Sequence, residues 1–276
     1  MASANSKRKY ADLHSHTPLS GHAAGEAEEY AAQAIAAGLA FYGCSDHFPL
    51  PEGYPTRCCI PFEQYPLYRD NWMPRLRKTL EGSGVELLYG TEFDFLPGRM
   101  ERTRPAMDAE PFDYRISSIH FIDEVPVDNT PEEWDAVGGT EQMWSLYADR
   151  MAQMVSEGNF EIIGHMDLPK KFNVYPADRS KYVLAMHDIL KVAAEKGICM
   201  ELNTAGLRKA AKEIYPTPAI VKMAFDAGVG LTFGSDSHLP REVGQDFDLA
   251  EKLARSVGYK CINTFRQKQR IELPFD

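Results

Sequence analysis

A pair of histidines separated by one residue stands near the start of this chain. His14 and His16 follow a short apolar run that begins at Lys9, and His22 lies six residues beyond His16. Residues i and i+2 of an extended segment point to the same side, so the two imidazoles can bind one metal ion. Neutral imidazole is a ligand for zinc, iron and related ions near neutral pH. The pattern indicates a metal site, although a lone His-x-His also arises by chance.

The other histidines also follow apolar runs, which we interpret as strands. Seven of the eight histidines lie at or just after the end of such a run, and His187, within a helical pattern, is interpreted as structural. In parallel α/β folds the carboxyl ends of the strands and the loops after them build the active site. The sequence therefore predicts one site built from His14, His16, His22, His47, Glu92, His120, His165, Asp236 and His238.

Short apolar runs alternate along the chain with amphipathic patterns, which is typical of parallel βα units. We expect strands over 9–13, 39–44, 85–89, 114–119, 160–163, 198–202 and 229–233, and a short tail strand near 261–265. We expect helices over about 26–37, 61–80, 140–157, 179–196, 217–227 and 248–256. The pattern predicts a barrel of about seven βα units with metal ligands at its mouth.

Length and composition fit one α/β domain. With 276 residues, 44% of them hydrophobic, the chain can bury one large core, so we expect a single domain over 1–276 with 1–8 as a disordered tail. The formal net charge of −10 argues against a nucleic-acid partner. Five cysteines without CxxC spacing indicate neither a disulfide framework nor a zinc knuckle. Without a signal peptide or a membrane span, we expect a cytoplasmic protein with no membrane partner.

Nine candidate ligands exceed the four that one tetrahedral zinc ion takes, and they suffice for two or three ions if a carboxylate bridges. Clustered metals generate hydroxide from water and neutralise phosphoryl oxygens, which suits hydrolysis of a phosphate ester. The sequence contains neither Gly-x-Gly-x-x-Gly nor a Walker-type phosphate loop. Each residue also has an ordinary alternative. A lone histidine can be a hydrogen-bonded surface residue, Glu92 with Asp94 can form a solvated turn, and Asp236 can cap a helix.

The order of these motifs resembles the PHP (polymerase and histidinol phosphatase) family, and within it the histidinol-phosphatase branch. The resemblance begins with DLHSHTPLSGH, including the spacing to His22, and covers roughly 10–248. The later segments in order are SDHFPLP, GTEFDFLPG, SSIHFIDEVPVD, IGHMDLPKKF, ELNTAGLRK and FGSDSHLPREVGQDFD. The metal motifs are typical of PHP proteins in general, whereas NTAGLRK and GQDFD indicate the histidinol phosphatases.

This resemblance implies a distorted (β/α)7 TIM-like barrel that holds three divalent metal ions, with zinc, iron and manganese as candidates. The first ion is then bound by His14, His16, Glu92 and Asp236. Glu92 also bridges to a second ion bound by His120 and His165. The third ion is bound by His22, His47 and His238. All nine positions carry the residue type that the family pattern requires.

The resemblance also implies a small-molecule substrate, L-histidinol phosphate, hydrolysed by a metal-bridging hydroxide to L-histidinol and phosphate. Glu92 and Asp236 are then catalytic, and Asp46 is a candidate general acid whose alternative role is to orient a ligating histidine. The expected substrate-binding residues are Arg208, Lys171, Lys170, Lys209 and Asn203. For the four basic residues, the alternative is a solvated basic loop without a ligand. We expect the segments 48–60 and 121–128 to cover the substrate.

Two other functions stay open. A PHP phosphoesterase for another small ester, such as a nucleotide or a sugar phosphate, would use the same metals. A non-catalytic metal-dependent binding module would be favoured by lost ligands, yet all nine are present. The sequence is also compatible with a homo-oligomer.

Overall fold

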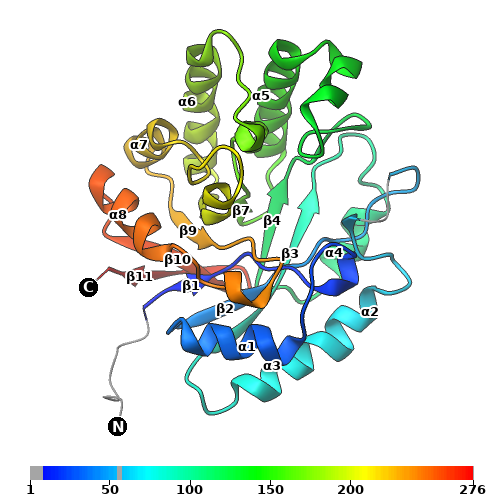
Figure 1. Cartoon of the computed structure of the whole chain (residues 1–276), viewed down its shortest axis with the longest axis vertical. Helices are drawn as coiled ribbons and strands as arrows, with labels where there is room; N and C mark the ends of the chain where they lie inside the picture. Colours follow the sequence, from blue (N-terminus) through cyan, green and yellow to red (C-terminus); the bar gives the residue numbers. More distant parts are fainter. Residues whose placement is uncertain (1–8, 55–57, 276) are drawn as a thin grey trace.

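Seven parallel strands form the centre of the computed structural model, which describes residues 9–54 and 58–275 (Figure 1). Their order in the sheet is their order along the chain, so each strand pairs with the next parallel strand. They are β1 (Ala11–Asp12), β2 (Phe41–Cys44), β3 (Glu86–Asp94), β4 (Tyr114–Ser118), β7 (Ile162–Ile163), β8 (Cys199–Asn203) and β9 (Leu231–Gly234). The tail expected over 1–8 lies outside the described residues.

The two outermost strands, β1 and β9, meet and close the sheet into a barrel. The backbone N–H of Leu13 donates to the carbonyl of Phe233 at 3.0 Å. Asp12 stabilises the contact between these two strands, because its carboxylate accepts hydrogen bonds from Ser235 and from the backbone N–H of Gly244. The expected distorted (β/α)7 barrel is confirmed.

Helices cover the outside of this barrel (Figure 1). They are α1 (Ala27–Ala36), α2 (Tyr65–Leu67), α3 (Met73–Leu80), α4 (Thr103–Asp108), α5 (Thr140–Glu157), α6 (Arg179–Glu195), α7 (Pro218–Ala227) and α8 (Phe247–Val257). The predicted helices are present, whereas α4 was not predicted because six residues with an internal proline show no helical period. Among the described residues, no helix has the length and apolar character needed to cross a membrane.

The helix predicted over 61–80 differs from the structure at its start and in its middle. Regular helix begins at Tyr65, and a π-helical segment, Tyr68–Trp72, separates α2 from α3. There the N–H of Met73 donates to the carbonyl of Tyr68, five residues earlier, as in a π-helix. The next residue, Pro74, has no N–H to donate.

The tail forms a hairpin rather than the single strand predicted. β10 (Cys261–Arg266) pairs antiparallel with β11 (Gln269–Pro274). The side-chain amide of Asn263 donates to the carbonyl of Leu231, the first residue of β9, at 2.9 Å. The hairpin therefore packs on the amino end of β9, away from the carboxyl ends of the barrel strands.

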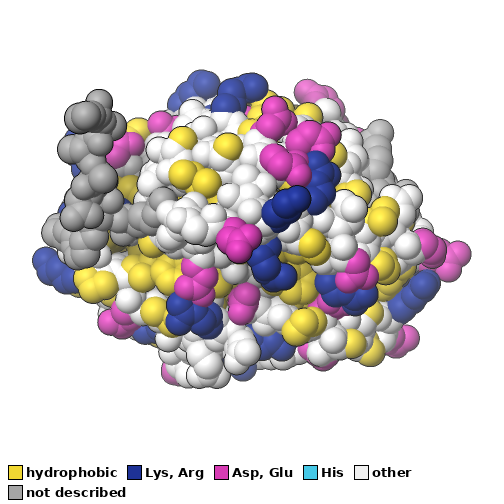
Figure 2. All heavy atoms as spheres, turned by 90° about the horizontal axis from the view of Figure 1, so that it is seen from below, with side chains coloured by type: hydrophobic (Ala, Val, Ile, Leu, Met, Phe, Trp, Pro, Cys, Tyr) yellow, Lys and Arg dark blue, Asp and Glu magenta, His cyan; other side chains and the backbone are white. Residues whose placement is uncertain are grey.

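One face of the molecule, shown in Figure 2, carries acidic, basic and apolar side chains side by side. Helices α1 and α3 lie on this side in Figure 1. Arg75 of α3 joins them by pairing with Glu26 and Glu28. On this face neither charge forms a continuous surface over the described residues.

A tyrosine fills the interior of the barrel. Tyr114 of β4 is fully buried, and its hydroxyl donates to the carbonyl of Leu13 at 2.7 Å. Its ring lies against the backbone of two neighbouring strands, at Gly43 of β2 and Gly90 of β3, where an added Cβ would overlap the ring or its hydroxyl. These two positions need glycine for space, because protein interiors are close-packed.

We predict that Gly43→Ala lowers the free energy of unfolding by about 2 kcal/mol, because the new methyl group overlaps the Tyr114 hydroxyl. Tyr114→Phe removes that oxygen, so the double variant should lose less stability than the sum of the single variants. At Gly90 the added Cβ meets ring carbon Cζ first, so Tyr114→Phe should rescue Gly90→Ala less. Urea unfolding measures these differences, and additive losses for the Gly43 pair would contradict the packing described.

Candidate metal centre

The carboxyl ends of the barrel strands surround a cavity of about 770 Å³. Eight of the nine predicted ligands line it, and the ninth, His14, is buried directly beneath, 3.2 Å from Glu92. Glu92 lies within β3 rather than after it, because the strand continues to Asp94. The structure therefore brings all nine residues together in one place.

Glu92 lies at the centre of this group and is almost fully buried. Its Oε2 faces three imidazole nitrogens, at 3.2 Å from His14 Nε2, 3.6 Å from His16 Nε2 and 3.2 Å from His47 Nδ1. Its Oε1 faces two others, at 3.0 Å from His165 Nε2 and 3.7 Å from His120 Nε2. A carboxylate whose two oxygens face separate sets of imidazoles is arranged to bridge two metal ions.

Asp236 stands beside the first of these sets. Its Oδ1 is 3.1 Å from Nε2 of His16 and 4.0 Å from Nε2 of His14. The backbone at Asp236 has a φ of 50°, in the left-handed region that non-glycine residues adopt infrequently. Such conformations cluster at functional sites, where the surrounding structure holds them.

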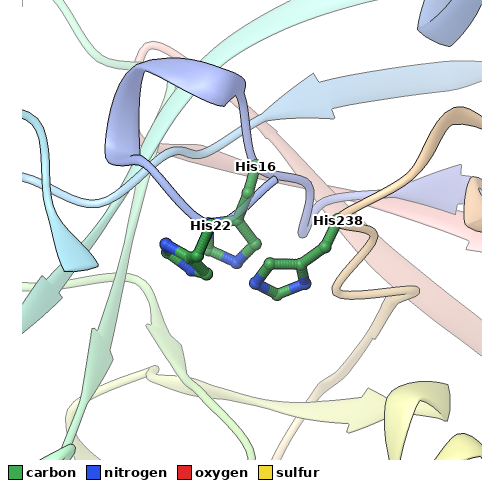
Figure 3. A group of neighbouring side chains, drawn as sticks. All are labelled: His16, His22 and His238. Atoms are coloured by element: carbon green, nitrogen blue, oxygen red, sulfur yellow. The ribbon is translucent and has the colours of Figure 1, made fainter. Parts of the chain in front are cut away.

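A third group consists of imidazole rings that converge from two loops, the one after β1 and the one after β9 (Figure 3). One nitrogen from each of His16, His22 and His238 lies within 4.8 Å of the other two. By the same criterion His47 groups with Asp94 and His120. The trio of His22, His47 and His238 implied by the family resemblance is adjacent, since the rings of His22 and His47 are 5.1 Å apart, but it is not one of these tight groups.

In five of these histidines, one ring nitrogen lies within hydrogen-bonding distance of a carboxylate or of a backbone carbonyl. Three face carboxylates, at 2.7 Å for His14 with Glu201, 3.4 Å for His16 with Asp46 and 3.0 Å for His120 with Asp94. Two face backbone carbonyls, namely His22 with Ser20 and His238 with Asp236. Metal-ligating histidines are held in this way, which fixes the tautomer and aims the other nitrogen at the metal.

Unpaired buried atoms at the centre test whether a metal would fit. Nε2 of His14, Oε2 of Glu92 and Nδ1 of His165 are buried, and none forms a hydrogen bond of normal geometry with another described residue, although the first two face each other at 3.2 Å. Buried polar atoms are rarely left unpaired. Imidazole nitrogens and carboxylate oxygens are donors that zinc, iron and manganese accept. The residues present therefore fit a metal centre.

The buried carboxylates control the protonation of these imidazoles. Burial lowers the pKa of His16, but hydrogen bonds to Asp236 and Asp46 outweigh it and raise the pKa to about 9. At His120 neighbouring carboxylates likewise outweigh burial and raise the pKa to about 10. Burial, together with the nearby His16, lowers the pKa of His238 to about 3. Without metal at neutral pH, His16 and His120 therefore carry protons, and His238 does not.

Glu201 belongs to the site but was not among the predicted residues. Its Oε1 is 2.7 Å from Nδ1 of His14, and its Oε2 accepts from the backbone N–H of His165 at 3.0 Å. An added Cβ at Gly234 of the neighbouring strand would overlap this carboxylate, so glycine makes room for it. The signal in the sequence was an acid in an apolar strand, two residues before Asn203 and hence on the same face.

Three predicted basic residues also line the cavity. Nη2 of Arg208 donates to the carbonyl of Ser235 at 2.6 Å, while its Nη1 is buried and has no acceptor in the described part of the chain. Lys209 lines the cavity nearby. Lys171 reaches it as well, and its ammonium pairs with the Asp128 carboxylate at 2.9 Å. The cavity therefore offers positive charge beside the candidate ligands.

The structure does not bring Lys170 to this cavity. Its ammonium is buried on the other side of the short 3-10 turn Leu168–Phe172, where it donates to Glu213 and to the carbonyl of Ile214, both at 2.8 Å. Successive residues of a 3-10 turn point about 120° apart, so Lys170 and Lys171 cannot face the same way. His187, expected outside the site, is half-exposed on α6.

Asp46 and Asn203 are fully buried and lie behind the ligands rather than on the cavity wall. Oδ1 of Asp46 is 3.4 Å from Nδ1 of His16. The amide of Asn203 donates to Oδ2 of Asp236 at 3.1 Å. These contacts favour the alternative expected for Asp46, orientation of a histidine, and they give Asn203 a similar role toward Asp236.

Both segments expected to cover the substrate reach the cavity. Leu50 and Cys58 line it from the first segment, whose residues 55–57 lie outside the described ranges. From the second segment, Phe121 and Asp128 line it, next to a two-stranded hairpin of β5 (Phe121–Ile122) and β6 (Val125–Pro126).

We predict that Glu201→Gln lowers the metal affinity of the chain about 10- to 100-fold, because an amide holds the Nδ1 hydrogen of His14 less strongly than a carboxylate does. Glu251→Gln is the matched control, since this buried carboxylate of α8 bonds Tyr10 and Lys9 instead. Competition with a chromophoric chelator measures both affinities. Equal affinities for the two variants would remove Glu201 from the site.

We also predict that metal binding at pH 7 releases about two protons per chain. His16 and His120, with pKa values raised to about 9 and about 10, are protonated at that pH, and a metal ligand must be neutral. The metal affinity should therefore rise with pH, and the release should fall toward zero above about pH 10. Calorimetry in buffers of different ionisation enthalpy counts the protons, and zero release at pH 7 would contradict the electrostatics described.

Comparisons with known proteins agree with this geometry. The family model of the PHP domain matches residues 12–205. A "Probable histidinol-phosphatase" of Deinococcus radiodurans is 36% identical over 261 residues, covering 94% of this chain and 97% of the relative. A "Probable phosphatase" of Clostridium acetobutylicum is 28% identical over 250 residues, covering 89% and 85%. A histidinol phosphate phosphatase of Lactococcus lactis, solved with zinc, L-histidinol and phosphate, has the same fold, with a TM-score of 0.81, 19% identity and coverage of 95% and 99%. The chain belongs to the PHP-domain family.

Proposed function

We propose that this chain is a metal-dependent phosphomonoesterase that hydrolyses L-histidinol phosphate to L-histidinol and phosphate. The observation that carries the proposal is the position of Glu92, whose two oxygens face separate sets of imidazole nitrogens at 3.0–3.7 Å. Such an arrangement suits two or more adjacent metal ions and a phosphoryl group. The name of the Deinococcus relative supports the choice of substrate.

The proposed centre holds three divalent ions, with zinc as the first candidate because the Lactococcus protein binds it. The three ligand sets implied by the family resemblance would hold the ions, and Glu92 belongs to the first two of these sets. The third set is His22, His47 and His238, with His16 close to all of them. When bound, the ions would activate water and neutralise the charge that develops on the phosphoryl oxygens.

The chain's own residues bind the phosphate group and orient the side chains that would hold the ions. Glu92 and Asp236 would hold the ions, and Asp46 and Asn203 orient His16 and Asp236 from behind. Arg208 is the first candidate for the phosphate, because its Nη1 has no acceptor in the described ranges and a guanidinium forms paired hydrogen bonds with phosphate. Lys209 and Lys171 would add positive charge from the cavity wall.

The remainder of the cavity suits the rest of the substrate. The substrate's imidazole ring and ammonium group call for an aromatic surface and a carboxylate. Phe121 supplies a ring on the cavity wall, and Asp128 and Glu242 supply carboxylates there.

The proposal also covers the organisation of the protein. We expect one domain over 1–276, a cytoplasmic location and a homo-oligomer.

A second candidate is hydrolysis of another small phosphate ester by the same centre. The Clostridium relative favours it, since its name specifies a phosphatase without a substrate. The two candidates share the metals and differ only in the residues that contact the alcohol part of the ester.

Phosphate release by the metal-loaded full chain tests both candidates. L-histidinol phosphate should be preferred over a nucleotide monophosphate and a sugar phosphate by about 100-fold or more in kcat/KM, because unpaired polar groups penalise the wrong ester. Release from none of the esters would contradict the phosphatase. Equal turnover of all of them would contradict only the choice of substrate.

We predict that Arg208→Ala raises the KM for the phosphate ester about tenfold or more and changes kcat less, because it removes a charged contact present in the bound substrate. Arg241→Ala is the matched control, since Arg241 is exposed in the nearby 3-10 turn Pro240–Glu242 and lies outside the cavity lining. Steady-state kinetics of both variants measure the effect, and an unchanged KM for Arg208→Ala would exclude this arginine from phosphate binding.

A further inference from the structure

A second cavity, of about 360 Å³, lies beside the metal cavity. The two cavities share a wall, because neighbouring residues of one turn face different ways. Leu168 and Lys171 line the metal cavity, whereas Asp167 and Lys170 line the second one. Its volume falls in the range of about 300–1,000 Å³ that is typical of small-molecule sites.

Aromatic rings form one side of this second cavity. The rings of Trp144 and Tyr175 stack at 5.7 Å, and Tyr182 meets Trp144 edge-on at 4.7 Å. The Trp144 indole N–H and the Tyr182 hydroxyl both donate to backbone carbonyls. Their polar groups are therefore already paired. The Arg179 guanidinium lies over the Tyr175 ring, 3.4 Å from its centroid, so the flat apolar surface left to a ligand is that of Trp144 and Tyr182.

A buried carboxylate forms the other side. Asp167 is only 2% exposed, and its Oδ2 accepts from the backbone N–H of Thr217 at 2.8 Å and lies 3.0 Å from the Lys170 ammonium. Its Oδ1 is buried and has no hydrogen-bond partner among the described residues. Because buried polar atoms are normally paired, this oxygen calls for a donor from a molecule in the cavity.

Among the described residues, none of the cations around this cavity supplies the missing donor to Oδ1 of Asp167. The Lys170 ammonium donates to Glu213 and to the Ile214 carbonyl besides facing Asp167. Arg179 and Lys212 are exposed, so water and salt screen their charges. The buried, unpaired atom in the lining is thus an acceptor on an acid.

We infer that this cavity is a second binding site, for a small organic amine with a flat apolar body. The ammonium group would donate to Oδ1 of Asp167, and the body would lie against the rings of Trp144 and Tyr182. Charge-assisted hydrogen bonds and cation–aromatic contacts both favour such a ligand over a neutral one of the same shape. This site is separate from the metal ligands and does not depend on the proposed reaction.

Calorimetric titration of the metal-loaded full chain with 2-phenylethylamine tests the inference, with 2-phenylethanol as the neutral probe of matching shape. The amine should bind one per chain, about tenfold or more tighter than the alcohol, and saturating inorganic phosphate should not displace it. Asp167→Asn should weaken binding of the amine about tenfold or more, because the amide keeps an oxygen for Thr217 but removes the charge.

A second pair of variants guards against a folding defect in Asp167→Asn. Val183→Trp fills the cavity from α6 and should abolish binding, whereas Leu184→Trp, at a neighbouring position that is 65% exposed, should leave it unchanged. The inference is overturned if the amine does not bind, if the alcohol binds equally well, if phosphate displaces the amine, or if Val183→Trp binds it like the wild type.

Discussion

The contact between a buried carboxylate, Glu92, and five imidazoles is the constraint on which the rest of this structure depends. A charge without water is costly unless partners of opposite charge surround it. Protons on His16 and His120 help to meet that requirement in the metal-free chain, and divalent ions would meet it in the loaded one. The same cluster therefore links folding, protonation and metal binding.

The barrel supplies the rigid frame that this cluster needs. Asp12 joins the first and last strands at the seam, and the Ser235 that it holds directly precedes the candidate ligand Asp236. Glycines make the space, with Gly234 admitting Glu201 against His14 and Gly43 admitting the ring of Tyr114. Outer carboxylates such as Asp94 and Glu201 then fix the rings that the strands deliver.

The sequence was enough to predict the barrel and the place where the nine candidate ligands meet, because both depend on short-range patterns. Period-two spacing put His14 and His16 on one side of a strand, and the strand ends collected the remaining candidates. The sequence could not predict which way a side chain points from a short turn, or which buried residues lie against each other. Lys170 turns away while Lys171 faces the cavity, since successive residues of a 3-10 turn point about 120° apart. Glu201 read as an ordinary strand residue because its partner, His14, is distant in the chain. Helix α4 was too short to show a helical period, and strand β11 was missed because its alternation rests on only two half-buried apolar residues, Ile271 and Leu273.

Anomalous diffraction at the zinc edge from crystals of the zinc-loaded protein tests the central claim most directly. The account predicts three peaks at the barrel mouth, two of them bridged by Glu92 at about 2.0–2.2 Å from its oxygens. A single peak, or peaks that Glu92 does not touch, would contradict it.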